Sequence, residues 1–304
     1  MNPFQKPFKK AFTNGHMIKI PYDIMVLKPG LMSSVQDLGR EGLASYGVPL
    51  SGAMDQTAMQ LANHLLQNAK HAAVLEMASP GPELQFDGPA RIVFTGALAD
   101  IKRNNVPVSL GQVLEIEEGD RIAIGKFSKG TWLYMAIQGG IESESIYESR
   151  SWYAGISSQV RLEKGDKIPY LHELKPYPSS LAHPKLTDSY FAKEIIPVYK
   201  GAEWHLLPDH LKRSLLTEPN SISSNISRMA YVLSASLPNT LGQILTAPVY
   251  PGTVQLTPAG SLIILMRDAQ VTGGYPRILQ VKEDALSGLA QKTPGSEVKF
   301  KLIY

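Results

Sequence analysis

The sequence predicts a mainly β protein with a few helices, folded as two similar lobes with a cleft between them. Short apolar runs recur between Gly, Pro and Asp residues at the spacing typical of β strands. The 25 glycines and 22 prolines among 304 residues imply many turns. Residues 84–94 and 254–265 share a pattern of two apolar runs, which either a duplicated β unit or common strand composition would produce. Clefts between domains are preferred ligand sites, so we expect a site between the lobes.

The composition excludes several classes of protein. Thirty Lys and Arg against 27 Asp and Glu give a net charge of +3, and 43% hydrophobic residues suffice for a large core. The basic residues are scattered, so nucleic acid is not expected as a partner. Without cysteine, a disulfide scaffold, a thiolate nucleophile, a zinc ribbon and iron–sulfur ligation are excluded. No apolar run approaches the roughly 20 residues of a membrane span, so we expect no membrane association and a cytoplasmic location.

Three parts are expected along the chain. Residues 1–22 show neither helical nor strand periodicity and are expected to be a disordered or poorly ordered tail, although Met17 could begin the folded part. Residues 23–175 are expected to form the N-terminal lobe and residues 186–304 the C-terminal lobe. Three prolines, two adjacent serines and few large apolar residues mark residues 172–185 as the linker.

The elements of each lobe follow from local patterns. A first strand is expected at residues 23–27, before the turn at Pro29-Gly30. A helix follows Asp55, because apolar residues recur at i, i+3, i+4, i+7 and i+8 from Ala58 to Leu66. Apolar runs bounded by turn residues predict further strands at 91–94, 121–124, 132–137 and 261–266, and helical periodicity predicts helices at 209–216 and 283–291. This strand-rich sequence fits a barrel or a sandwich.

Three familiar site motifs are missing or incomplete. The segment from Gly119 to Lys126 has one residue too many between its glycines for a phosphate loop. Pro208 interrupts the spacing of His205 and His210, so no metal site is expected. The Gly-x-Ser-x-Gly elbow of serine hydrolases does not occur.

The turn before the first helix is one candidate site. Ser51, Gly52 and Asp55 lie in it, and the free amides at a helix N-terminus attract carboxylates and oxyanions. The alternative is that Ser51 and Asp55 only cap the helix, which their side-chain oxygens would do equally well.

The turn after the expected strand at 261–266 is a second candidate. Its glycines, Gly273 and Gly274, allow a ligand to approach the backbone closely, and Gln270, Thr272 and Tyr275 offer neutral donors and acceptors. A tight hairpin would explain the same residues. Separately, Arg228 could bind a carboxylate through both arms of its guanidinium, or could be an ordinary surface charge.

Taken together, these segments resemble the biotin-dependent carboxyltransferase family. The matching motifs run in order over residues 26–300, nearly the whole chain apart from the tail. They are Val35-Gln36-Asp37-Leu38-Gly39-Arg40, Tyr46 to Pro49, Ser51 to Asp55, Ala72-Ala73, Leu75-Glu76, Gly81-Pro82, Thr95-Gly96-Ala97, Gly139-Gly140-Ile141, Ser149-Arg150-Ser151, Arg228-Met229, and Gln270 with Thr272 to Pro276.

The resemblance implies two cyclophilin-like β-barrel lobes. It also implies, as the first expectation, the role of the C subunit in an ATP-dependent 5-oxoprolinase, which opens the lactam of 5-oxo-L-proline to L-glutamate together with the A and B subunits. The B subunit is the Kip inhibitor-like partner, and the ATP site could lie on a partner or be shared with it. One alternative is carboxyl transfer to urea or a related amide from carboxybiotin on a separate carrier. Another is a non-catalytic regulatory binding protein of the Kip antagonist type.

Under the first expectation the candidate residues receive roles. Arg228 would hold the substrate carboxylate, Asp55 or Tyr275 would move a proton, and the amides of Gly273 and Gly274, or those after Ser51, would stabilise an oxyanion. The chain departs from the family pattern at four places: Ala69, Val232, Val271 and the segment Thr246-Ala247-Pro248. Three of these lie in the second lobe, which implies an altered substrate preference or a weaker activity if that lobe lines the site.

Overall fold

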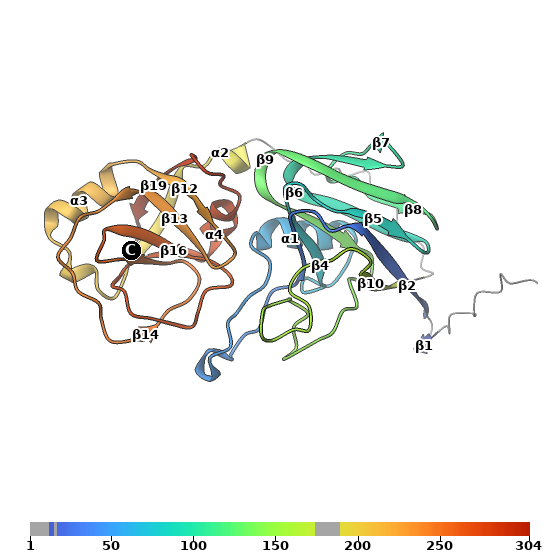
Figure 1. Cartoon of the computed structure of the whole chain (residues 1–304), viewed down its shortest axis with the longest axis horizontal. Helices are drawn as coiled ribbons and strands as arrows, with labels where there is room; N and C mark the ends of the chain where they lie inside the picture. The colour runs from blue at the N-terminus through green and yellow to red at the C-terminus, as the bar shows by residue number, and fades with distance from the viewer. Residues whose placement is uncertain (1–11, 15–16, 174–188) are drawn as a thin grey trace, which may run out of the picture.

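The computed structural model of the protein describes residues 12–14, 17–173 and 189–304 (Figure 1). Two β lobes lie side by side along the long axis of the molecule, the first drawn in blue to green and the second in yellow to red. The prediction of a mainly β fold with a few helices is confirmed. Residues 1–11 of the expected tail, and most of the expected linker at 172–185, lie outside the described residues.

The first lobe is a curled sheet of ten strands, ordered β1-β2-β5-β9-β4-β3, with β10 on β2 and with β6 pairing β7, β8 and β9. In the described residues this sheet curls into a half-barrel, which agrees with the β-barrel-like lobe that the family resemblance implied. Its strands are β1 (Phe12–Asn14), β2 (Met17–Lys28), β3 (Met32–Gln36), β4 (Val74–Ala78), β5 (Glu83–Phe86), β6 (Ala90–Arg103), β7 (Val106–Pro107), β8 (Leu114–Ile116), β9 (Arg121–Ile137) and β10 (Lys167–Glu173).

Strand β2 begins at Met17, within the segment expected as a tail, and its backbone pairs with β1, β5 and β10. Pairing on both edges explains why this stretch is extended although its residues lack strict alternation. The helix after Asp55 is α1 (Gln56–Leu65), which packs on β6 and β9. A short 3₁₀ turn, η1 (Ala44–Tyr46), precedes it.

The second lobe is a closed barrel, ordered β11-β18-β15-β16-β13-β12-β19, which β19 completes by pairing in parallel with β11. The barrel strands are β11 (Ile195–Lys200), β12 (Asn220–Ile226), β13 (Ala230–Ser236), β15 (Thr253–Leu256), β16 (Ser261–Leu265), β18 (Arg277–Val281) and β19 (Glu297–Leu302). The remaining elements are the β14 (Ala247–Pro248) and β17 (Thr272–Gly273) pair, the helices α2 (Ser189–Ala192), α3 (Asp209–Thr217) and α4 (Glu283–Ala290), and the 3₁₀ turn η2 (Trp204–Leu206). The predictions of β16, α3 and α4 are confirmed to within a residue.

One hydrophobic cluster crosses from the first lobe into the second. It contains Met59 of α1 and Trp132 of β9 together with Tyr231 and Ile264 inside the barrel and Leu289 of α4. A separate cluster fills the inside of the curled sheet. The lobes therefore share apolar packing where α1 and α4 approach each other, and this packing fixes their relative position. No helix in the described parts of the chain combines the length and the apolar character of a membrane span.

Candidate functional site

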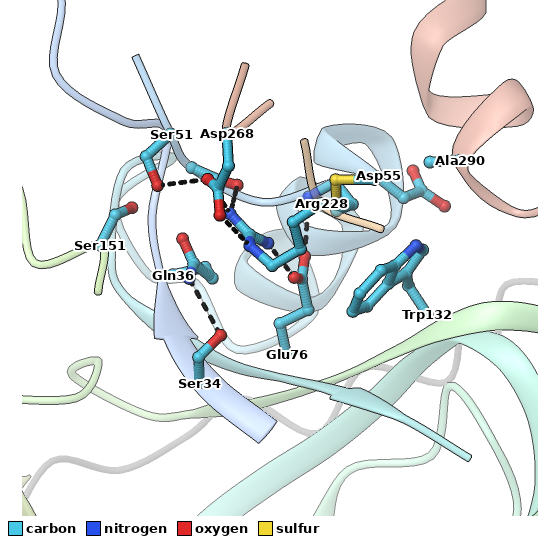
Figure 2. A network of polar contacts seen from close by, with 12 residues as sticks. Ser34, Gln36, Ser51, Asp55, Glu76, Trp132, Ser151, Arg228, Asp268 and Ala290 are labelled. Carbon is cyan, nitrogen blue, oxygen red and sulfur yellow. Dashed lines mark hydrogen bonds and ion pairs between the residues drawn. The ribbon is translucent and has the colours of Figure 1, made fainter. Parts of the chain in front are cut away.

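A buried ion cluster joins the two lobes (Figure 2). Arg228, just before β13, donates from Nε to Asp268 Oδ2 at 2.7 Å and from Nη2 to Asp268 Oδ1 at 2.8 Å. Toward the first lobe, its Nη1 pairs with Glu76 Oε1 of β4, and Nη2 donates to the Gly52 carbonyl at 2.7 Å. The Arg228 side chain is only 6% exposed. One guanidinium therefore binds two carboxylates that come from different lobes.

Glu76 is fully enclosed within this cluster. Its second oxygen accepts hydrogen bonds from the Met54 amide at 2.7 Å and from the Tyr134 hydroxyl at 2.8 Å. Burial raises the pKa of the Glu76 carboxyl above its usual value, although the neighbouring Arg228 opposes that shift. Arginine does not lose its proton in proteins, so the charge of Arg228 is what holds these acids in place.

The Ser51-Gly52 turn brings the first lobe to the cluster. Ser51 has a positive φ of 56° and Gly52 one of 91°. A Cβ atom at Gly52 would lie 2.8 Å from the backbone of Leu38, so only glycine fits there. This conformation lets the Ser51 hydroxyl donate to Asp268 at 2.8 Å and the Gly52 carbonyl accept from Arg228.

Asp55 caps α1, as one of the two sequence interpretations stated. Its Oδ1 accepts from the Ala58 amide at 2.9 Å and from the Tyr190 hydroxyl at 2.8 Å, while Oδ2 accepts from Gln291 Nε2 at 2.8 Å. Burial raises the pKa of the Asp55 carboxyl, and these hydrogen bonds limit the rise. Asp55 thus lies in a second contact between the lobes, beside Trp132 and Ala290 in Figure 2, with its oxygens taken up by protein donors.

The second candidate turn lies on the β14–β17 ribbon. Gly273 pairs with Ala247 and Thr272 with Pro248, and the Gly274 carbonyl accepts from the Ile244 amide at 2.9 Å. Thr272 is exposed, while Gln270, Gly273, Gly274 and Tyr275 are half-buried. Asp268, at the start of this turn, forms an ion pair with Arg228. Among the described residues, no hydrogen bond or ion pair joins the side chains of Gln270, Thr272 or Tyr275 to Arg228.

The sequence analysis counted Leu75-Glu76 among the family motifs but gave neither Glu76 nor Asp268 a role in the site. Both carried a usable signal, since Glu76 lies within the apolar strand Val74–Ala78 and Asp268 follows the apolar strand Ser261–Leu265 by three residues. Acids in such places are rarely buried unless they are paired. The sequence analysis assigned the guanidinium of Arg228 to a substrate carboxylate. In the structure it binds the carboxylates of Glu76 and Asp268.

Asp37, after β3, organises the backbone behind the Ser51-Gly52 turn. Its carboxylate accepts from the hydroxyls of Ser149 and Ser151 at 2.7 and 2.6 Å and from the Arg150 amide at 2.6 Å. Its carbonyl accepts from the Ala53 amide at 2.8 Å. The motifs around residues 37, 52 and 150 are therefore one connected structure.

A cavity of about 350 Å³, lined in part by Asp37, lies within the first lobe. It opens at the C-terminal end of α1 and is lined by Asn68, Gly140, Glu142 and Arg150 among others.

The ion cluster contains three charged groups, those of Arg228, Glu76 and Asp268. Asp268 is the most exposed of them, with 13% of its side chain accessible. The ion cluster therefore leaves part of one oriented carboxylate accessible, that of Asp268, while the fully buried Ser51 hydroxyl helps to hold it. Among the described residues, no three His, Asp or Glu side chains gather as a metal site would require.

Known proteins resemble the chain over most of its length. It is 29% identical over 287 residues to the 5-oxoprolinase C subunit of Haemophilus influenzae, covering 89% of this chain and 88% of that protein. It is 28% identical over 284 residues to the 5-oxoprolinase C subunit of Escherichia coli, covering 91% and 90%. The urea amidolyase of Lachancea kluyveri is 28% identical over 92% of this chain, which corresponds to 17% of that much longer protein.

Solved structures share the fold. The crystal structure of TTHA0988 superposes with a TM-score of 0.81 at 25% identity over 99% of this chain, and the chain spans 59% of its length. The K. lactis urea amidolyase gives the same score and identity over 93% of this chain, which is 19% of that protein. The family model described as carboxyltransferase domain, subdomain A and B, matches residues 46–302, which include the turns, the ion cluster and the whole barrel. The chain belongs to this carboxyltransferase domain family.

Proposed function

We propose that the chain is the C subunit of an ATP-dependent 5-oxoprolinase, acting with the A and B subunits to open 5-oxo-L-proline to L-glutamate. The observation that carries the proposal is the end-to-end similarity to two proteins of that name, each matched over about nine tenths of its own length. The urea amidolyase relative contains a matching region as only 17% of a larger chain. The chain thus matches the two C subunits over nearly their whole length as well as in sequence, which favours the 5-oxoprolinase role.

The reaction adds water across the lactam C–N bond, so the ring becomes the carboxylate and amine of glutamate while ATP is hydrolysed to ADP and phosphate. An amide carbonyl is a poor electrophile, so negative charge that develops on its oxygen needs fixed donors. The amides of Gly273 and Gly274, or those of the Ser51-Gly52 turn, are the donors we propose. ATP would bind to a partner protein or be shared with it, and the complex would be cytoplasmic.

Proton transfer is assigned to Asp268 in this proposal. Its carboxylate is oriented by Arg228 and Ser51 and keeps an accessible face, whereas Asp55 is enclosed by donors from Tyr190 and Gln291. Arg228 then acts as a positioning residue that fixes Asp268. Tyr275, with Gln270 and Thr272, stays a proposed lining residue, since all three are near Asp268 in sequence.

Reconstitution tests the proposal. The purified A and B subunits, this chain, ATP and 5-oxo-L-proline are mixed, and glutamate is followed while each protein is omitted in turn. We expect glutamate only from the complete mixture and a loss of about tenfold or more with Asp268→Asn. Asp209→Asn on the exposed start of α3 is the matched control and should leave the rate unchanged. Equal glutamate yield without this chain would refute the assignment.

A second candidate is carboxyl transfer from carboxybiotin, held on a separate carrier, to urea or a related amide. The similarity to urea amidolyase over 92% of this chain favours it. In the same assay, biotin carboxylase, its carrier, bicarbonate, ATP and urea would replace 5-oxoproline and the A and B subunits. Carboxylated urea that appears only when this chain is present would support this alternative.

A further inference from the structure

The cavity in the first lobe is separate from the ion cluster, because none of the three charged groups of that cluster lines it. Its volume of about 350 Å³ lies in the range of sites that bind small molecules. Its wall is formed mainly by the loop after α1, the Gly139-Gly140 turn after β9 and the segment 142–150. Two of the lining residues, His71 and Glu148, are exposed, so the cavity can be reached from solvent.

Contacts between these segments hold the cavity in shape. Asn68 Oδ1 accepts from the Gly139 amide at 2.9 Å, and Asn68 Nδ2 donates to the Ile137 carbonyl at 2.8 Å. Gly140 has a φ of 86°, and a Cβ atom there would lie 3.2 Å from the Cβ atom of Ala72. The turn and the loop after α1 are therefore tied together by the protein itself.

Arg150 collects three acids at the cavity. Its Nη2 pairs with Glu142 Oε2 at 2.5 Å, and its backbone amide donates to Asp37 Oδ2 at 2.6 Å. Glu148 lies two residues before Arg150, in the tight turn that the Ile146–Ser149 pair closes. All three acids and Arg150 line the cavity.

The charged groups of the wall keep unused hydrogen-bonding capacity. Arginine has five side-chain N–H donors, and Arg150 uses two of them, one to the Ser143 carbonyl and one to Glu142. Among the described residues, Glu142 Oε1 and the Glu148 carboxylate have no hydrogen-bond or ion-pair partner. The side chains of Glu142 and Arg150 are 34% and 29% exposed. Free acceptors and free charged donors thus lie side by side in accessible positions.

Negative charge is in excess among these groups. The charge of Asp37 is offset by the nearby Arg40, and that of Glu142 by its ion pair with Arg150. Glu148 has no basic partner among the described residues. A cationic group of a ligand is therefore attracted to the free carboxylates, whereas an anionic group can be bound only by the remaining N–H donors of Arg150.

We propose that this cavity binds a free α-amino acid with an uncharged side chain. The ammonium of the ligand donates to the Glu148 carboxylate and to Glu142 Oε1, and its carboxylate accepts from the free N–H groups of Arg150. A primary ammonium has three donors and no acceptor, which suits two carboxylates with unused oxygens. 5-Oxo-L-proline has no ammonium and is not a ligand of this cavity, so the inference does not depend on the proposed function.

Isothermal titration calorimetry on the full chain tests the inference. The probes are L-glutamine, N-acetyl-L-glutamine, which lacks the ammonium, and 5-oxo-L-proline. We expect L-glutamine to bind about tenfold or more tightly than N-acetyl-L-glutamine. Glu148→Gln removes the free carboxylate at an exposed position without a protein partner, and should weaken L-glutamine binding by about tenfold or more. The same variant should leave the weak binding of N-acetyl-L-glutamine unchanged, a selectivity that a general structural defect would not produce.

Two further variants separate binding from folding. Glu144→Gln is the matched control, because Glu144 is an acid of the same segment that does not line the cavity, and it should leave every binding constant unchanged. Arg150→Met should also weaken L-glutamine binding by about tenfold or more, since the ligand carboxylate loses its donors. Arg150 also holds the Ser143 carbonyl, so Glu148→Gln decides the question if Arg150→Met does not fold.

Three results would overturn the inference. They are equal affinities of the native chain for L-glutamine and N-acetyl-L-glutamine, an L-glutamine affinity that Glu148→Gln leaves unaltered, and no heat of binding with any of the three probes. A loss of L-glutamine binding in Glu144→Gln as large as in Glu148→Gln would also count against the cavity as the site.

Discussion

Ser51 donates its hydroxyl to Asp268 at 2.8 Å, a contact between residues 217 positions apart. The same carboxylate receives two hydrogen bonds from Arg228 within its own lobe. Asp268 is thus oriented from both lobes at once, and any movement of one lobe against the other must break one of these contacts. A carboxylate fixed in this way suits chemistry that requires constant geometry.

Replacing Arg228 tests how strongly the ion cluster holds the lobes. Arg228→Met leaves Glu76 and Asp268 without their common partner, and removing one member of a buried ion pair costs about 3–5 kcal/mol. We expect a loss of that size in the free energy of unfolding, measured in urea. Lys212→Met removes the exposed Lys212–Asp209 pair on α3 and should change stability by less than about 1 kcal/mol. Equal effects of the two substitutions would show that the cluster does not stabilise the junction.

The Ser51-Gly52 turn gives a prediction about backbone geometry. Gly52→Ala places a Cβ atom 2.8 Å from the Leu38 backbone at a φ of 91°. Gly42 has a similar φ of 76° but open space around it, so Gly42→Ala reports the conformational strain alone, about 1–2 kcal/mol. We expect Gly52→Ala to lower the melting temperature clearly more than Gly42→Ala. If the two variants have the same melting temperature, the close approach of residues 38 and 52 does not restrict position 52 to glycine.

Helices and strands that depend mainly on local interactions were predicted correctly from local sequence patterns. The periodicity from Ala58 to Leu66 and the side chain of Asp55 specify α1 and its cap without help from the rest of the chain. The strand at 261–265 and the helices α3 and α4 were found for the same reason. The closure of the barrel was not predictable in this way, because β19 joins β11 across nearly the whole second lobe.

The site was less accessible from the sequence because its contacts are tertiary. Arg228, Ser51 and Gly52 were chosen as candidates and do meet in the ion cluster, while Asp55 lies in the second contact between the lobes. The acids that bind Arg228, Glu76 and Asp268, come from parts of the chain that are far apart. A guanidinium that looks free in a sequence can be neutralised by partners that only the fold supplies. Whether Gln270, Thr272, Gly273, Gly274 and Tyr275 contact substrate stays a prediction.

Gln291, at the end of α4, should be important for the second contact between the lobes. Its amide donates to Asp55 and to the Trp132 carbonyl, both at 2.8 Å, and its oxygen accepts from the amides of Thr131 and Trp132. Gln291→Met keeps the volume but leaves several buried groups unpaired, each costing about 1–3 kcal/mol. We expect a destabilisation of at least about 2 kcal/mol in urea unfolding. The matched variant Gln138→Met, at a half-exposed position after β9, should have a much smaller effect.

The buried carboxyl of Asp55 predicts a pH dependence of stability. Burial raises its pKa in the folded protein above the ordinary value of about 3.9, so the folded state holds this proton more tightly than the unfolded state. Stability from this group is complete at low pH and falls as pH rises from the ordinary pKa to the raised one, by at most about 1.4 kcal/mol per unit. Asp55→Asn should remove that fall when unfolding is measured between pH 4 and pH 8. A pH profile parallel to that of the native chain would contradict the assignment.

The pKa of Asp120 shifts in the opposite direction to that of Asp55. Burial alone would raise its pKa, but hydrogen bonds from the Glu117 amide and from Asn104 and Arg103 lower it overall. The unfolded state then binds the proton more tightly, so the stability from Asp120 is present above the ordinary carboxyl pKa and is lost as pH falls through the lowered one. Asp120→Asn should therefore bring the stabilities of variant and native chain together as the pH falls below about 4. Because the two aspartates are predicted to change stability in opposite directions with pH, a common slope for both variants would mean that neither carboxyl controls it.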